Sequence, residues 1–149
     1  MIQVWLSKAM EDQAAMLPEA ARLWYAWAGE RGYENPDLEA YIGSLMDRVR
    51  GGHYMIVLAF KDGRTVGMVD VQVDYEPATR RVFSFIDKLY VVPESRGSGR
   101  VAWQLACGAE VAARLMGAEE ARLTVRKDGP KRFYERRGFE AEHVVMRYE

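Results

Sequence analysis

A glycine-rich turn between a strand-like run and a helix-like run carries the residues best suited to chemistry. The turn spans residues 96–100, follows a strand-like run that ends at Val92 and precedes the amphipathic segment 101–116. A helix that starts from such a turn leaves backbone N–H groups without intrahelical partners. With the positive end of the helix dipole behind them, these groups can bind an anion such as a pyrophosphate. Arg96 and Arg100 add positive charge, so we expect a phosphate-bearing ligand here.

The composition of the chain limits the kinds of protein that it can be. The chain has 149 residues, of which 49% are hydrophobic and 29% charged, and this length and composition predict one globular domain over residues 1–149. The net charge of −1 gives no reason to expect a nucleic-acid or membrane partner. The single cysteine, Cys107, cannot form an internal disulfide or a cysteine-rich metal site, and we expect no metal. The first residues lack the pattern of a secretory signal, and no apolar run approaches the ~20 residues that span a bilayer. We therefore expect a cytoplasmic protein.

Hydrophobic periodicity predicts the elements that must position this turn. The predicted order is β-α-α-β-β-β-α-β-α-β, which defines an α/β fold with a mixed, mostly antiparallel sheet flanked by helices. The predicted strands are 2–6, 54–60, 65–75, 81–92, 121–125 and 139–148, and the predicted helices are 8–31, 37–49, 99–116 and 129–137.

Several residues mark where these elements begin, break or end. Pro18 predicts a break or kink in the first helix, and Asp37 is suited to cap the second. Asp62 and Gly63 lie between two strand-like runs and indicate a hairpin turn. Gly117 is suited to end the helix that follows the glycine-rich turn.

The strand that leads into the glycine-rich turn breaks its own alternation. Its apolar residues include Ile86 and Leu89, a step of three where a regular strand has steps of two. One extra residue around Asp87 and Lys88, a β-bulge, accounts for this step. A strand buried on both faces would also tolerate the irregularity, but bulges concentrate near active sites, and this one lies directly before the anion-binding turn.

Two segments resemble signatures of the GNAT N-acyltransferase superfamily. Residues 89–99, with the sequence LYVVPESRGSG, resemble its acyl-CoA binding motif. Residues 133–139, FYERRGF, are similar to a second signature, an aromatic-tyrosine pair followed by a glycine-phenylalanine entry into a strand. The likeness covers residues 57–148, whereas the first fifty residues match only in having a strand and two helices.

The resemblance implies a function and a site. It implies direct transfer of an acetyl group from acetyl-CoA to a primary amine, carried by a small molecule or by a protein or peptide. Tyr134 would lie near the sulfur and protonate the leaving thiolate, and Asp87, on the bulged strand, is the carboxylate we favour as base. The bulge would present an N–H to the acyl carbonyl. The residues implied to bind the cofactor are Leu89, Tyr90, Val91, Arg96, Gly97, Ser98, Gly99, Arg100, Val101 and Tyr134.

Several alternatives stay open at this stage. Val101 stands where the family usually has glycine or alanine, so either its side chain points into the core or it weakens pyrophosphate binding. Asp70, Asp74, Glu76 and Glu34 are rival carboxylates, which we expect at the surface or in contact with the acceptor. A non-catalytic acyl-CoA-binding or regulatory module is the competing function. A homodimer formed through the last strands is the self-association that such a sheet would favour.

Overall fold

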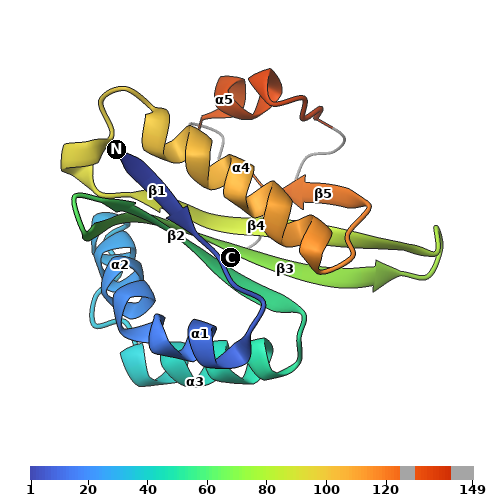
Figure 1. Ribbon diagram of the computed structural model, residues 1–149, viewed down its shortest axis with the longest axis horizontal. Coiled ribbons are helices and arrows are strands. Elements are labelled where there is room, and N and C mark those ends of the chain that lie inside the picture. The colour runs from blue at the N-terminus through green and yellow to red at the C-terminus, as the bar shows by residue number, and fades with distance from the viewer. Residues whose placement is uncertain (125–129, 142–149) are drawn as a thin grey trace.

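Five strands form one sheet in the order β1-β2-β3-β4-β5 in the computed structural model, which describes residues 1–124 and 130–141 (Figure 1). Neighbouring strands are antiparallel except for the parallel pair of β4 and β5. The strands are β1 (Ile2–Trp5), β2 (Tyr54–Lys61), β3 (Arg64–Glu76), β4 (Arg81–Val91) and β5 (Glu120–Leu123). The helices are α1 (Met10–Ala15), α2 (Leu17–Glu30), α3 (Leu38–Arg50), α4 (Arg100–Leu115) and α5 (Lys131–Arg136), and Pro93–Ser95 form a 3₁₀ turn. The mixed α/β architecture is the predicted one.

Local sequence signals explain where these elements start and stop. The predicted first helix is two helices, α1 and α2, with Pro18 in the first turn of α2, where its missing N–H has no cost. Asp37 caps α3 by accepting a hydrogen bond of 3.0 Å from the Ala40 N–H. Asp62 and Gly63 both have positive φ, +52° and +75°, and join β2 to β3 in the tight turn that favours the twist of a hairpin. Each of these sequence predictions is confirmed.

The last third of the chain departs from the prediction in its bounds. β5 begins one residue earlier than expected and ends at Leu123, and α5 is shorter than the predicted helix 129–137. The predicted closing strand, 139–148, is wrong at its start, because residues 139–141 form no strand. Its remaining residues lie outside the described part of the chain. Phe139 instead closes the turn after α5, where its N–H donates to the Tyr134 carbonyl.

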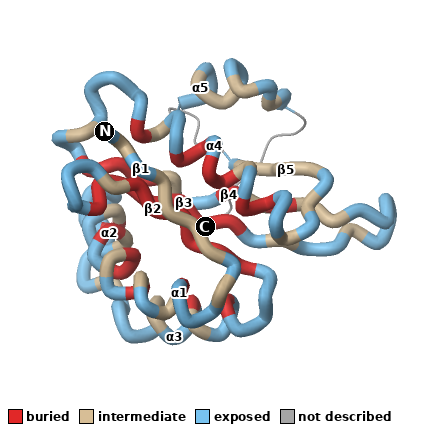
Figure 2. Tube along the Cα trace, viewed as in Figure 1, coloured by how far each residue is buried: buried red, intermediate tan, exposed pale blue. Residues whose placement is uncertain are grey.

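The core lies on both sides of the middle strands, which are the most deeply buried segment of the tube in Figure 2. On one face, α4 packs so closely that a Cβ atom on Gly108 would lie 2.7 Å from Val4 Cγ1 and 2.9 Å from Val57 Cγ1. On the opposite face, α2 and α3 contribute Leu23 and Leu45 (Figure 1). Within the described residues, no helix combines the length and apolarity needed to cross a membrane.

Candidate active site

A bulge in β4 lies opposite β3, as the sequence predicts. Met68 pairs with Tyr90 and Asp70 pairs with Asp87, so β4 has one more residue than β3 in this interval. Lys88 occupies the bulge with a φ of +50°, a left-handed conformation that is uncommon for a residue with a side chain. The bulge re-aims the strand at one defined point, and it does so immediately before the segment that resembles the acyl-CoA motif.

Beyond Ile86, β4 has no pairing with β5, which ends at Leu123. The parallel pairing of the two strands runs from Phe83 and Glu120 to Ile86 and Leu123 and stops there. β4 continues to Val91 with β3 as its only strand neighbour among the described residues. Its other edge therefore offers main-chain hydrogen-bonding groups to an extended ligand, as a strand edge does in β-augmentation.

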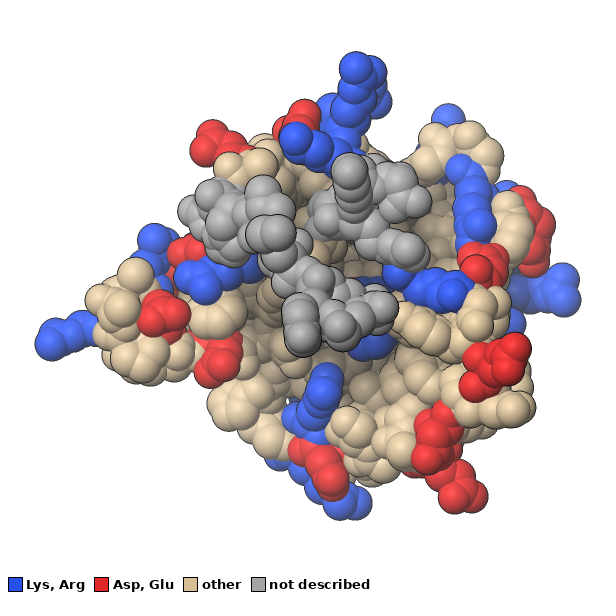
Figure 3. Space-filling view, turned by 180° about the vertical axis from the view of Figure 1, so that it is seen from behind, with Lys and Arg blue, Asp and Glu red and all other residues tan. Residues whose placement is uncertain are grey.

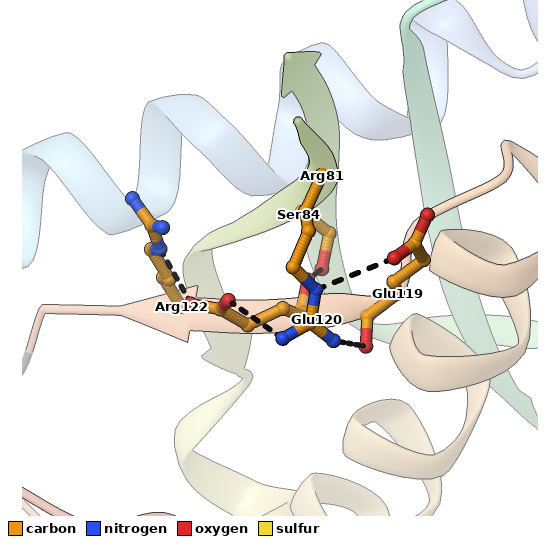
Figure 4. A network of polar contacts seen from close by, with 5 residues as sticks. All are labelled: Arg81, Ser84, Glu119, Glu120 and Arg122. Carbon is orange, nitrogen blue, oxygen red and sulfur yellow. Dashed lines mark hydrogen bonds and ion pairs between the residues drawn. The ribbon is translucent and has the colours of Figure 1, made fainter. Parts of the chain in front are cut away.

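A network of polar contacts joins the first residues of β4 to the start of β5 (Figure 4). Arg81 at the start of β4 contacts Glu119 at 3.3 Å and Glu120 at 3.9 Å. The Ser84 hydroxyl donates to the Glu120 carbonyl at 3.3 Å, and within β5 Arg122 binds the Glu120 side chain at 2.8 Å. The contacts between the two strands therefore lie within the stretch where they pair, and β4 continues beyond it.

The glycine-rich turn adopts the geometry that an anion site needs. Gly99 lies directly before α4 with a φ of +72°, a conformation that glycine adopts without steric cost. The N–H groups of Gly97, Ser98, Val101 and Ala102 have no hydrogen-bond partner among the described residues. These groups are available at the positive end of a 16-residue helix, which matches the expected pyrophosphate site.

Three of the predicted N–H donors are already occupied. The Arg96 N–H donates to the Pro93 carbonyl at 3.3 Å, and the Arg100 N–H contacts the Ser98 hydroxyl at 3.3 Å. The Gly99 N–H likewise donates to the Arg96 carbonyl at 3.1 Å. Fewer N–H groups are therefore free to bind an anion than the sequence implies.

Val101 turns its side chain into the core. It is 3% exposed, and a Cβ atom on Gly67 of β3 would lie 3.3 Å from Val101 Cγ1. Its methyl groups therefore fill the space between α4 and β3 while its N–H stays at the start of the helix. Of the two alternatives that the sequence leaves open for Val101, the structure selects the packed one.

The Arg96 side chain links the turn to α2. Its guanidinium donates to both carboxylate oxygens of Glu30, at 2.8 and 2.6 Å, and to the Val91 carbonyl at 2.7 Å. Tyr90, predicted to bind the cofactor, is buried, and its hydroxyl donates to the same Glu30 at 3.2 Å. Arg96 therefore shapes the turn, and Arg100 is the exposed arginine whose side chain has no partner among the described residues.

Tyr134 lies on α5, which rests on α4 (Figure 1). The two helices are joined by Arg137, which binds Glu110 at 2.6 Å, and by an edge-to-face contact between Phe133 and Trp103. Burial raises the pKa of Tyr134, so its hydroxyl keeps its proton at neutral pH. Among the described residues that hydroxyl has no hydrogen-bond partner, and its role as a proton donor stays a prediction.

The two carboxylates beside the bulge differ in their surroundings. Asp87 has a half-exposed side chain, and Lys88 binds both of its oxygens, through the main-chain N–H at 2.8 Å and through Nζ at 2.9 Å. For Asp70 the sequence leaves a surface position or a contact with the acceptor, and an exposure of 2% excludes the surface position. Burial raises the pKa of Asp70 to about 6 against the opposing effect of Lys88, whose Nζ lies 3.5 Å from Oδ2.

Charge is distributed unevenly over the face seen from behind in Figure 3. Lysine and arginine side chains are spread over this face, near its middle as well as at its rim, whereas aspartate and glutamate side chains lie mostly toward its rim. The molecule can therefore present positive potential locally although its net charge is −1. Such a distribution suits a ligand that carries phosphates.

The Acetyltransferase (GNAT) family model matches residues 14–139, and the chain belongs to that family. Among curated proteins, it is similar to aminoalkylphosphonate N-acetyltransferase of Salmonella typhimurium, with 32% identity over 93 residues. That match covers 61% of this chain and 58% of the relative, so the chain spans little more than half the length of this curated relative.

Solved acetyltransferase structures share the fold over the full chain. A complex of AAC(6')-Iy with a bisubstrate analogue superposes with a TM-score of 0.79 at 20% identity, covering 100% of this chain and 97% of that one. A predicted acetyltransferase of Clostridium acetobutylicum, solved with acetyl-CoA, gives 0.75 at 17% identity, with 100% and 96% covered. Ribosomal-protein-alanine N-acetyltransferase of Brucella melitensis gives 0.72 at 21% identity, with both chains covered completely.

Proposed function

We propose that this protein is an acetyl-CoA-dependent N-acetyltransferase that acts on a primary amine. The observation that carries the proposal is the bulged β4, which continues past the end of its pairing with β5 and leads directly into the glycine turn before α4. Family membership and the named relative, an N-acetyltransferase, support it.

The residues present fit acetyl-CoA. The free N–H groups at Gly97, Ser98 and Val101 suit its pyrophosphate, with Arg100 beside them. The unpaired edge of β4 over residues 89–91 suits the pantetheine arm, which has amide groups of its own. When bound, the ligand supplies an acetyl thioester, a carbonyl activated toward an amine.

The catalytic roles are assigned to Tyr134 on α5 and Asp87 on β4. We propose Tyr134 as the proton donor to the leaving sulfur, because its hydroxyl is protonated at neutral pH and free of partners in the described part of the chain. Asp87 stays a prediction as general base. Its two oxygens are bound by Lys88, which lessens its capacity to take a proton.

The acceptor and the setting follow from the same chemistry. We propose a small molecule or peptide with a primary amine, in keeping with the aminoalkylphosphonate acceptor named for the relative. A cytoplasmic location suits an enzyme that draws on acetyl-CoA, and neither nucleic acid nor a membrane is part of the proposal. A homodimer through the last strands stays a prediction, because those residues lie outside the described part of the chain.

The proposal is tested by mixing purified protein with acetyl-CoA and a panel of primary amines, and measuring release of free thiol. We expect acetyl-CoA to bind, as seen by calorimetry, and at least one amine to raise thiol release well above hydrolysis. Tight binding without release for every amine would favour the alternative, a non-catalytic acyl-CoA-binding module. Absence of binding would refute both.

A further inference from the structure

A cluster of buried polar atoms with few good hydrogen bonds lies under the bulge, between the sheet and α3. Its members are the carboxylate of Asp70 on β3 and the hydroxyls of Tyr54 on β2 and Tyr41 on α3. The Asp70 carboxylate interacts only loosely with the Tyr54 hydroxyl and with Lys88, whose Nζ lies 3.5 Å from Oδ2, and the Tyr41 hydroxyl forms no hydrogen bond with a described residue. Buried polar atoms are nearly always well paired, so this cluster can accept a further polar partner.

The surroundings show what charge that partner carries. Burial raises the pKa of both tyrosines, and the nearby Asp70 carboxylate raises each of them further. The charged and titratable groups that face Asp70 are Tyr54 from β2, Tyr41 and Arg48 from α3, and Lys88 and Asp87 from β4. A cation with several N–H donors would satisfy the carboxylate and the hydroxyls together.

Lys88 already places an ammonium group at this position. Its Nζ lies 2.9 Å from Asp87 and 3.5 Å from Asp70 Oδ2, so it binds the exposed carboxylate firmly and the buried one only loosely. Burial lowers the pKa of Lys88, but the two carboxylates more than offset this and raise it, so the group stays charged. Asp70 Oδ1 is left without a partner among the described residues.

We propose that Asp70 binds the acceptor as an ammonium ion and takes the proton that frees its nitrogen for attack. A primary ammonium has three N–H donors, and the Asp70 carboxylate and the hydroxyls of Tyr41 and Tyr54 provide acceptors for them. Lys88 keeps its contact with Asp87 and yields its looser contact with Asp70 to the acceptor. This inference rests on the proposed acetyltransferase function and adds the base and the acceptor class, an unhindered alkylammonium.

The proton balance of the reaction follows from this assignment. One N–H proton passes to Asp70 and from there to solvent. The nitrogen then forms a bond to the acetyl carbon as the carbon–sulfur bond breaks. The sulfur takes the Tyr134 proton, and the second N–H proton restores the tyrosine. A base that titrates near pH 6 is ionised at pH 7 and still basic enough to accept a proton, which an ordinary exposed aspartate does less well.

The first test is Asp70→Asn, which keeps the shape of the side chain and removes its charge. We expect kcat/KM for the amine to fall about 100-fold with acetyl-CoA affinity within about twofold of wild type. Asp62→Asn, in the hairpin turn at a φ that asparagine also adopts, is the matched control and should keep wild-type activity. An Asp70→Asn rate within threefold of wild type, or a 100-fold loss in Asp87→Asn with Asp70→Asn active, would overturn the assignment.

A pH profile separates a base from a merely structural residue and does not depend on how Asp70→Asn folds. In wild type, kcat/KM should fall as the pH drops through about 6, where Asp70 becomes protonated. Lys88→Met removes the cation that opposes this protonation, so the acid limb should move to higher pH. An acid limb that stays in place in Lys88→Met contradicts the proposal. If the wild-type protein binds acetyl-CoA but acetylates no amine, the proposed function itself fails. That outcome differs from failure of the Asp70 assignment, because the tests with variants require an active wild-type enzyme.

Discussion

Asp70 and Asp87 are paired directly across β3 and β4, yet their side chains are 3% and 50% exposed. Side chains of such a pair point to the same face of the sheet. The difference in exposure therefore comes from what covers that face. The helices α2 and α3 lie over the middle of the sheet, where they cover Asp70, and they leave Asp87 open. A buried carboxylate that has only loose contacts with Tyr54 and Lys88 is costly to the fold, and its retention needs a reason outside stability.

That cost gives a stability prediction for Asp70→Asn. In wild type the pKa of Asp70 rises from 3.8 to about 6 on folding, so the native state binds the proton more tightly than the unfolded chain. The contribution of Asp70 to stability is consequently greatest below about pH 4 and is lost as the pH rises through about 6. The neutral asparagine removes this loss, so the free energy of unfolding at pH 7.5 should rise by up to about 3 kcal/mol.

Urea denaturation at pH 7.5 and pH 4 measures the effect. The gain should be present at the higher pH and vanish at the lower one, where wild-type Asp70 is itself neutral. A variant that is less stable than wild type at pH 7.5 would mean that the carboxylate supports the fold, contrary to this prediction.

Gly99→Ala should weaken cofactor binding through backbone strain. The φ of +72° costs a residue with a Cβ atom about 1 kcal/mol, and relief of that strain would move the N–H groups at the start of α4. We expect the Kd for acetyl-CoA to rise about fivefold or more, measured by calorimetry.

Gly63→Ala is the matched control for that variant. Gly63 has a φ of +75° in the β2–β3 turn, and a Cβ atom there would meet nothing within 4 Å, as at Gly99. Both variants should lose about 1 kcal/mol of stability, but only Gly99→Ala should lose acetyl-CoA affinity. Equal acetyl-CoA affinities in the two variants would mean that the glycine-rich turn does not bind the cofactor.

Tyr134→Phe should lower kcat without changing the binding of acetyl-CoA. The hydroxyl is protonated at neutral pH because burial raises its pKa, so its loss removes a proton donor and leaves the ring packing intact. We expect kcat to fall about 10- to 100-fold in the thiol-release assay, with the KM for acetyl-CoA unchanged. Tyr25→Phe, at an exposed tyrosine of α2, should behave as wild type. A Tyr134→Phe enzyme with full kcat would exclude the hydroxyl as the donor.

Features set by neighbouring residues could be predicted from the sequence. The step of three between Ile86 and Leu89 predicted the bulge, and Asp62 with Gly63 predicted the hairpin turn, because backbone geometry leaves few residues suited to such positions. The contact between Arg96 and Glu30 could not be predicted, because it joins residues far apart in the chain.

The burial of Asp70 was not predicted, for an identifiable reason. It alternates with Gln72 and Asp74, and this polar alternation predicts a face toward solvent without saying how much of that face is covered. A signal was present on the neighbouring strand β2. Asp70 pairs with Ile56, within the continuous apolar run of β2, whereas Gln72 pairs with Tyr54, the first residue of β2. Apolar residues on both faces of β2 indicate that its neighbours are covered on both faces as well.

The open edge of β4 has a consequence for how this protein can diverge. Hydrogen bonds from a ligand to main-chain atoms do not depend on the identity of the side chains that project above and below the strand. Substitutions along residues 89–91 can therefore accumulate as long as the backbone keeps its course. Retention of the backbone course while the side chains change is consistent with a shared architecture at 17–21% identity.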